Sequence, residues 1–328
     1  MMDSPASVSD DVAVLCGGVG AARFLTGAVQ VRPAASITAV VNTADDTVIN
    51  GLAISPDLDT IVYTLAGAID PQRGWGLRGE TWTAIEALQR YVAVRPDTST
   101  AAVTWFRLGD RDLATHLYRT ARRGEGATLT EITAEIAAAW DVGVRVLPMT
   151  DGDVSTHLIL ADGSDLPFQD YFVRLHHDVE VAAVNIETSG SEPTAAAIRA
   201  IADAEIVVVA PSNPLVSIQP LRALPGIDES LSRRRDSVVA VSPIIGGRAL
   251  KGPADRLLRE LGHEPSVVGI ARIYAPIAAA LVIDPVDAEL AGAVEAAGMR
   301  PVVAPSVMST PPAAAQLARA TLDAAVSR

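Results

Sequence analysis

The sequence predicts an α/β fold: a doubly wound, mostly parallel, Rossmann-like sheet with a helical insertion and a small β insertion over the active site. Three observations support this. The apolar run DVAVLC leads into a glycine loop and then a helix. Short apolar runs rich in β-branched residues alternate with helix-like stretches along much of the chain. Most of the later runs end in Pro, Ser, Asn or Gly, where such sheets carry their ligand loops.

The apolar runs are the expected strands, and the amphipathic stretches between them are the expected helices. Strands are predicted in DVAVLC, ASITAVVN, VRVLP, EVAAVNI, EIVVVAP, SVVAVSP, SVVGIA, AALVID and PVVAP. Helices are predicted from about Ala21, from PDLDT onward, in TAAAIRAIADA, PADRLLRELG and DAELAGAVEAAG, and in the alanine-rich tail PPAAAQLARATLDAA.

The alternation is interrupted once, and this interruption divides the chain. Residues 62–140 are mainly helical, and 151–175 predict two short strands around a turn. We therefore expect a nucleotide-binding core formed by 10–61 and 179–328. The segment 62–178 is the predicted insertion, packed over the mouth of the sheet.

Composition excludes several classes of partner. A formal charge of −13 and a pI near 4.8 argue against a nucleic-acid-binding surface. No apolar run approaches the ~20 residues of a membrane helix, so no membrane partner is expected. The polar start, MMDSPASVSDD, lacks the pattern of a signal peptide, which predicts a cytoplasmic protein. The single cysteine, Cys16, is expected to be a buried structural thiol.

The glycine loop is the first candidate ligand site. Gly17, Gly18 and Gly20 follow the first strand, and backbone amides at a helix start can hold a phosphate. Arg23 stands where a dinucleotide-binding fingerprint has its third glycine, and no Walker lysine follows. A tight structural turn is the alternative interpretation.

Four carboxylates lie within twenty residues of the second strand. Asp45 and Asp46 leave its carboxyl end, and Asp57 and Asp59 begin the next helix. Asp57 is expected to cap that helix. Asp45 and Asp59 could converge on one hard cation, because Mg²⁺ typically takes one or two carboxylates and fills its shell with water and phosphate oxygens. Solvated loop acids are the alternative for each residue.

Later loops add further candidates. Ser212 and Asn213 follow the strand EIVVVA, and Arg248 and Lys251 lie in the loop after the next strand. Each loop could instead be a plain connection, yet several ligand-type loops at one sheet edge favour a nucleotide site. Asp110 or Asp112 is expected to cap a helix, and His116 and His157 are expected to be structural.

These motifs, taken in order, resemble the 2-phospho-L-lactate transferase family (the CofD/FbiA type) of coenzyme F(420) biosynthesis. The resemblance rests on GGVGAARF, VNTADD, SPDLDT, RGWGLRGETW, LGDRDLATH, APSNPLVSI and SPIIGGRALKGP, over about residues 12–256. It implies transfer of a phospho-three-carbon acid from a guanosine diphosphate conjugate to the ribityl hydroxyl of a deazaflavin, releasing GMP. The acid is lactate, enolpyruvate or glycerate. It also implies Mg²⁺ and a homodimer.

The resemblance also implies roles for individual residues. Asp45 and Asp59 would be catalytic and hold the metal. The deazaflavin would lie against Asp59, Trp75, Arg107 and Arg111. The nucleotide would be held by Gly17, Gly18, Gly20, Ser212, Asn213, Ser217, Ile218 and Arg248. Two departures are Ala21, where many relatives have glycine, and Met308-Ser309-Thr310, where Met-Thr-Asp is expected.

Two other functions are weighed against this one. A nucleotide-sugar-binding regulator of the same superfamily would share the glycine loop and sheet, but it would need neither PDLDT nor GDRDLATH. An NAD-dependent oxidoreductase is disfavoured by Arg23 and by the lack of a suitable acidic residue at the tip of the second strand.

Overall fold

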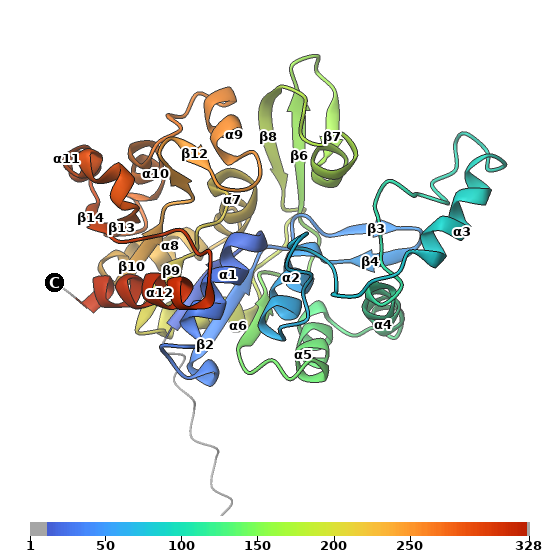
Figure 1. The fold of residues 1–328 in the computed structure, drawn as a ribbon, viewed down its shortest axis with the longest axis horizontal. Coiled ribbons are helices and arrows are strands. Elements are labelled where there is room, and N and C mark those ends of the chain that lie inside the picture. Colours follow the sequence, from blue (N-terminus) through green and yellow to red (C-terminus); the bar gives the residue numbers. More distant parts are fainter. Residues whose placement is uncertain (1–11, 327–328) are drawn as a thin grey trace, which may run out of the picture.

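The computed structural model describes residues 12–326 and has a seven-stranded sheet at its centre. The strand order is β14-β13-β10-β9-β1-β2-β5, and every neighbouring pair is parallel. Its strands are β1 (Val12–Cys16), β2 (Ile37–Val41), β5 (Arg145–Pro148), β9 (Ile206–Val209), β10 (Val238–Val241), β13 (Ala280–Ile283) and β14 (Arg300–Val303). This confirms the predicted α/β fold with a parallel sheet (Figure 1).

Helices cover both faces of the sheet, because successive side chains of a strand point to opposite faces. Val12, Val14 and Cys16 pack into one apolar core, and Ala13 and Leu15 into the other. The first core is covered by α1 (Gly18–Ala28), α2 (Pro56–Leu65), α5 (Leu129–Ala139) and α12 (Pro311–Val326). The second is covered by α6 (Ala195–Asp203), α7 (Gln219–Arg222), α8 (Ile227–Arg233), α9 (Ala254–Glu260), α10 (Val267–Tyr274) and α11 (Ala291–Ala296). None of the helices in residues 12–326 has the length and apolar character needed to cross a bilayer.

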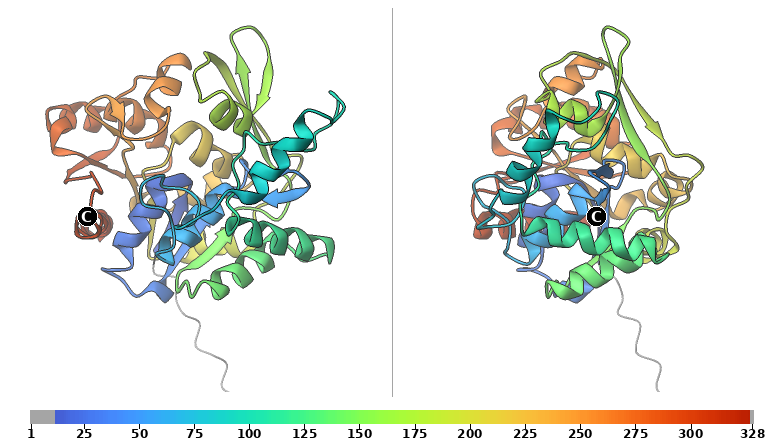
Figure 2. Two further views of the ribbon diagram at one scale, coloured as in Figure 1. Left: turned by 45° about the vertical axis from the view of Figure 1, so that its right-hand side comes forward. Right: turned by 90° about the vertical axis from the view of Figure 1, so that its right-hand side faces the viewer.

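Two smaller antiparallel units project from this core, as Figures 1 and 2 show. An antiparallel hairpin, β3–β4, follows β2 directly and packs against α4. A three-stranded antiparallel sheet, ordered β7-β6-β8, lies beside α9. The bounds are β3 (Thr47–Ile49), β4 (Leu52–Ile54), α3 (Thr83–Val92), α4 (Asp112–Gly124), β6 (Ser155–Leu160), β7 (Asp165–Pro167) and β8 (Val181–Glu187).

Short helical turns and a two-residue ladder complete the connections. They are η1 (Ala34–Ser36), η2 (Asp170–Arg174), η3 (Pro214–Ile218), η4 (Arg235–Ser237), η5 (Pro285–Leu290), β11 (Ile244–Ile245) and β12 (Arg248–Ala249). Cys16 is buried in the core as predicted, and burial raises the pKa of its thiol.

VRVLP forms β5 of the central sheet, as a predicted strand, although it lies inside the range 62–178 that was assigned to the insertion. Two predicted elements are wrong in place or type. EVAAVNI was expected in the core sheet, but it forms β8 of the small antiparallel sheet, with one face exposed. SVVGIA was expected to be a strand and instead begins helix α10, because Ser266 caps the amides of Val268 and Gly269.

The strand order reverses between β1 and β9, and this fixes where a ligand can bind. The chain runs outward from β1 to β2 and β5, then returns to place β9 on the other side of β1. Doubly wound sheets bind ligands outside the carboxyl ends of their strands at such a switch point. The glycine loop after β1 and the loop after β9 meet there.

Candidate functional site

The two loops at the switch point are locked together. The amide of Gly17 donates to Oγ of Ser212 at 3.2 Å, and that hydroxyl lies 2.7 Å from the carbonyl oxygen of Gly17. A Cβ atom on Gly20 would lie 2.2 Å from the carbonyl oxygen of Pro211, so only glycine fits. Helix α1 begins at Gly18, whose φ of +66° is also a glycine conformation. The loop therefore presents a fixed backbone at a helix start.

The carboxylate of Asp57 lies against this glycine loop. It accepts a hydrogen bond from the amide of Gly18, and a Cβ on Gly17 would lie 3.1 Å from its Oδ2. The same Cβ would lie 2.5 Å from Cβ of Ser217. Gly17 therefore lies between Asp57 and the segment that follows β9. The prediction that Asp57 caps helix α2 is wrong: Ser55 occupies the cap position, and Asp57 lies in the first turn.

The four carboxylates divide into two groups. On the core side, Nδ2 of Asn42 donates to Oδ2 of Asp45 and to Oδ2 of Asp57, each at 3.1 Å. On the insertion side, Asp59 pairs with Arg119 of helix α4. Asp46 accepts a hydrogen bond of 2.6 Å from Oγ of Ser55. The structure thus brings Asp45 together with Asp57 rather than with Asp59.

Three of the four acids, Asp45, Asp46 and Asp57, lie in a setting that disfavours their charge. Burial raises the pKa of Asp46 to about 8 and that of Asp57 to about 6. Burial, followed by the charges of Asp57 and Asp46, raises the pKa of Asp45 well above its usual value. Asn42 and Thr156 partly offset this rise in pKa by hydrogen bonding to the carboxyl, but Oδ1 of Asp45 is buried without a well-formed hydrogen bond in the described part of the chain. A bound cation would relieve the repulsion and pair with this oxygen.

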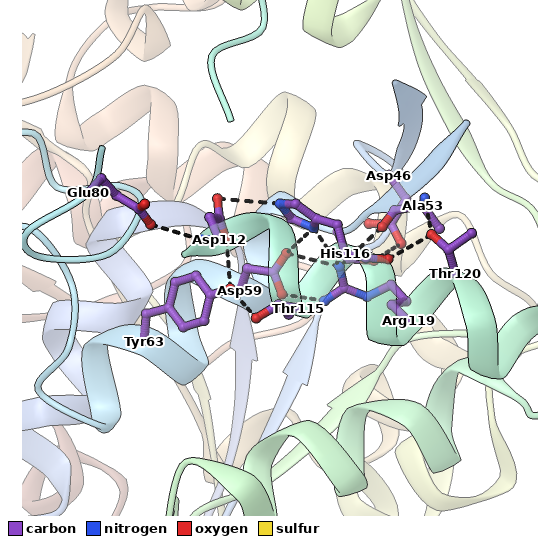
Figure 3. A network of polar contacts seen from close by, with 11 residues as sticks. Asp46, Ala53, Asp59, Tyr63, Glu80, Asp112, Thr115, His116, Arg119 and Thr120 are labelled. Carbon is purple, nitrogen blue, oxygen red and sulfur yellow. Dashed lines mark hydrogen bonds and ion pairs between the residues drawn. The ribbon is translucent and has the colours of Figure 1, made fainter. Parts of the chain in front are cut away.

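Asp59 belongs to a buried polar network (Figure 3). Both of its oxygens accept hydrogen bonds from the guanidinium of Arg119. His116 lies between two acids, with Nδ1 at 3.8 Å from Asp59 Oδ2 and Nε2 at 3.3 Å from Asp112 Oδ2. The hydroxyl of Tyr63 lies 2.7 Å from both Asp112 Oδ1 and Thr115 Oγ1.

An aromatic and cationic cluster lies in the insertion, close to this network. The rings of Trp75 and Trp82 meet edge to face with centroids 6.3 Å apart. Arg73 lies 5.3 and 5.1 Å from these two rings, and Arg107 lies 4.6 Å from Trp82. Trp75 is 43% exposed, so its ring can accept a planar partner. The guanidinium of Arg111 is held by the carbonyl of Arg78 at 2.5 Å.

The remaining predicted nucleotide residues occupy the loop after β9 and the β11–β12 hairpin. Oδ1 of Asn213 caps η3 by accepting from the amides of Leu215 and Val216. The Ile218 side chain is fully buried, so only its backbone could meet a ligand. Arg248 is exposed on the β11–β12 hairpin, whereas the Nζ of Lys251 would lie 3.0 Å from a Cβ on Gly74. Lys251 therefore joins this loop to the Trp75 loop.

Comparison with known proteins identifies the family. The family model described as 2-phospho-L-lactate transferase CofD matches residues 12–309. The chain belongs to this family. Proteins named phosphoenolpyruvate transferase from Streptomyces griseus, Nocardia farcinica and Mycobacterium tuberculosis are 41%, 39% and 40% identical to it. Each match covers 96% of this chain, and 98%, 94% and 98% of the respective relative.

A solved structure supports the fold of this CofD-family chain. The crystal structure of a UPF0052 family member from Bacillus halodurans superposes with a TM-score of 0.58 at 16% identity. It covers 95% of this chain and 98% of that protein. At this level of identity the likeness concerns the fold alone.

The site of this CofD-family chain contains residues that the sequence analysis missed. Asn42 joins Asp45 to Asp57, and its place at the end of β2 was the available signal. Arg73 was missed, although its position beside Gly74-Trp75 marks it as part of the same loop. Arg119 was missed because an arginine in a polar helix is usually exposed, whereas this one is 2% exposed.

Two other expectations concern polar residues outside the centre. Asp110 does not cap α4; it accepts from the amides of Thr83 and Ala84 at the start of α3. The hydrogen bond from the Thr81 hydroxyl contributes most to lowering the pKa of Asp110, and together with these two backbone hydrogen bonds it brings the pKa to about 2. His157 lies 2.7 Å from Asp165 on the neighbouring strand β7, which fits the structural role expected for it.

Proposed function

We propose that this chain transfers a phosphoenolpyruvyl group from a guanosine diphosphate conjugate to the ribityl hydroxyl of 7,8-didemethyl-8-hydroxy-5-deazariboflavin in coenzyme F(420) biosynthesis. The observation that carries the proposal is the division of the four carboxylates. Asp45 and Asp57 lie with the glycine loop, and Asp59 lies on the side of the Trp75–Trp82 cluster. A phosphate-binding half thus meets an aromatic half at the switch point of the sheet.

The choice of donor follows from the relatives. Proteins named phosphoenolpyruvate transferase are 39–41% identical to this chain over nearly its whole length. We therefore favour enolpyruvate over lactate and glycerate. The product would be dehydro-F(420)-0, and the released nucleotide would be GMP.

The residues present fit a Mg²⁺ ion on the core side. Oδ1 of Asp45 is buried without a well-formed hydrogen bond in the described part of the chain, and Asp57 shares Asn42 with Asp45. Among residues 12–326, no group of three or more His, Cys, Asp or Glu forms a metal cage, which suits an ion that prefers few carboxylates, water and phosphate oxygens. We propose Asp57, in place of Asp59, as the second ligand, because Asn42 holds Asp57 beside Asp45 and Arg119 already neutralises the charge of Asp59. When bound, Mg²⁺ would neutralise charge on the diphosphate.

The protein's own groups would position both reactants. The amides of the glycine loop and of the loop after β9 would hold the guanosine diphosphate. Trp75, Arg107 and Arg111 would hold the deazaflavin, with Asp59 facing the ribityl chain. The ribityl oxygen would attack the phosphorus that carries enolpyruvate, and the bond from that phosphorus to the GMP oxygen would break. A carboxylate of the cluster would take the alcohol proton.

Product analysis tests this proposal. The purified protein is incubated with deazaflavin, Mg²⁺ and each of the three donors generated in situ, and the products are identified by mass spectrometry. GMP release together with the enolpyruvyl product supports the proposal. A lactyl or glyceryl product instead would refute the choice of donor. Deazaflavin binding without GMP release from any donor would favour the regulatory alternative. The homodimer and the cytoplasmic location stay predictions.

A further inference from the structure

Helix α4 turns a polar face toward the candidate site. Asp112, Thr115, His116 and Arg119 are spaced by three or four residues, so they lie on one side of the helix. Three of them are buried: Thr115 is 7% exposed, His116 1% and Arg119 2%. An arginine in particular is almost never fully buried unless it is paired. The face contacts the β3–β4 hairpin, and it bonds to Tyr63 and Asp59 of α2.

The contacts of Arg119 fix the direction of its guanidinium. Beside the two hydrogen bonds to Asp59, Nη1 lies 3.3 Å from the carbonyl oxygen of Ala53 and 3.2 Å from Nδ1 of His116. Thr120 ties the same helix to the hairpin by accepting from the amide of Ala53 at 2.8 Å. A bidentate guanidinium–carboxylate pair has a fixed geometry, so Arg119 also fixes the orientation of the Asp59 carboxylate.

The network continues from Asp59 to the aromatic cluster. Asp112 lies 3.3 Å from His116, and its backbone amide donates to Oε1 of Glu80 at 2.9 Å. Oε2 of Glu80 accepts from the amide of Arg111 at 2.8 Å. Figure 3 shows Glu80 beside Asp112. In the sequence, Glu80 lies two residues before Trp82. One continuous chain of contacts therefore links the Asp59 carboxylate on α2 to the loop that carries Trp82.

We propose that Arg119 is a positioning residue for the transfer reaction, holding the Asp59 carboxylate in the orientation that receives the acceptor hydroxyl, with His116 supporting the guanidinium. The inference rests on the proposed function. A buried ion pair that served stability alone could be replaced by apolar side chains of similar volume with little loss in the free energy of unfolding. A positioning pair cannot, because a misplacement of about 1 Å at a reacting group can cost about 100-fold in rate.

The test compares Arg119→Ala, Arg119→Lys and the control Arg122→Ala. Arg122 is on the same helix but pairs with Glu125 and Glu135 at the surface. We expect Arg119→Ala to lower kcat by about 100-fold, with KM for the donor little changed, and added guanidinium to restore part of kcat. Arg119→Lys should fall between wild type and Arg119→Ala, and Arg122→Ala should match the wild type.

A binding measurement separates this inference from the proposed function. Deazaflavin fluorescence is titrated without donor or metal. Arg119→Ala should raise the Kd for deazaflavin by about tenfold, because a displaced Asp59 loses one hydrogen bond to the acceptor, whereas Arg122→Ala should not change it. Absence of GMP release from the wild type would refute the function, and the titration would still test Arg119. If Arg119→Ala does not fold, Arg119→Lys and His116→Gln are used instead. A folded Arg119 variant with wild-type kcat and wild-type Kd for deazaflavin would overturn the inference.

Discussion

Replacing Gly20 by alanine would force a methyl group into the backbone of the neighbouring loop. The added Cβ would lie 2.2 Å from the carbonyl oxygen of Pro211, whereas real contacts of this kind stay above 3.0 Å. The glycine loop and the loop after β9 would have to separate by about 0.8 Å to restore that distance. Overpacking of this kind costs about 1–3 kcal/mol. The same movement should lower the rate of GMP release by about 10- to 100-fold.

Chemical denaturation and GMP release test this prediction together. Gly124→Ala is the matched control, because a Cβ there meets nothing within 4 Å and Gly124 ends helix α4 far from the two loops in sequence. Gly124→Ala should leave activity unchanged and keep or slightly raise stability. The interpretation of the two loops as one rigid unit would be refuted if Gly20→Ala retained wild-type stability and wild-type activity.

Two more predictions concern the charged and aromatic halves of the site. The pKa values of Asp57 and Asp46, raised to about 6 and about 8, mean that the folded state binds protons more readily than the unfolded chain. The stabilisation that the protonated carboxyls provide is complete below the unfolded pKa of about 4 and is lost as pH rises to about 6 for Asp57 and about 8 for Asp46. The Tm of the metal-free protein should therefore fall between about pH 4 and about pH 8. Mg²⁺ should then raise Tm more at the upper end of this range, and an equal effect of Mg²⁺ at both ends would contradict the metal assignment. Trp75→Ala should raise the Kd for deazaflavin by about 5- to 50-fold, whereas Tyr91→Ala, also exposed but on α3, should not; fluorescence titration decides between them.

The central sheet was predictable because its strands are short, apolar and rich in β-branched residues. Val12–Cys16 and Ile206–Val209 are buried on both faces, which is the pattern of parallel strands in doubly wound sheets. The same criterion failed for SVVGIA, since a short apolar run does not by itself distinguish a buried strand from a buried helix. The Ser266 cap was the signal that could have decided it.

The β3–β4 hairpin was missed although the sequence contains its signal. Asn50 and Gly51 both have positive φ, at 52° and 81°, as a type I′ turn requires. An Asn-Gly pair between apolar residues is the strongest short-range hairpin signal. This hairpin separates Asp46 from Asp57, and so it sets where the carboxylates lie.

The candidate site was predicted by residue type but not by pairing. The sequence indicated that four carboxylates and a glycine loop share one sheet edge. It could not show that Asn42 selects Asp45 and Asp57, because hydrogen-bond partners depend on side-chain directions. Nor could it show that Arg119, sixty residues after Asp59, neutralises that carboxylate. Such long-range pairs become visible only when the insertion is placed against the core.

The Mg²⁺ dependence of GMP release in two variants tests the division of the carboxylates most directly. Asp57→Asn keeps the shape of the side chain and removes a proposed metal ligand. It should raise the Mg²⁺ concentration for half-maximal activity by about tenfold or more. Asp59→Asn should lower activity without moving that concentration. A shift in Mg²⁺ dependence confined to Asp59→Asn would contradict the account and would restore the pairing of Asp45 with Asp59 that the sequence first predicted.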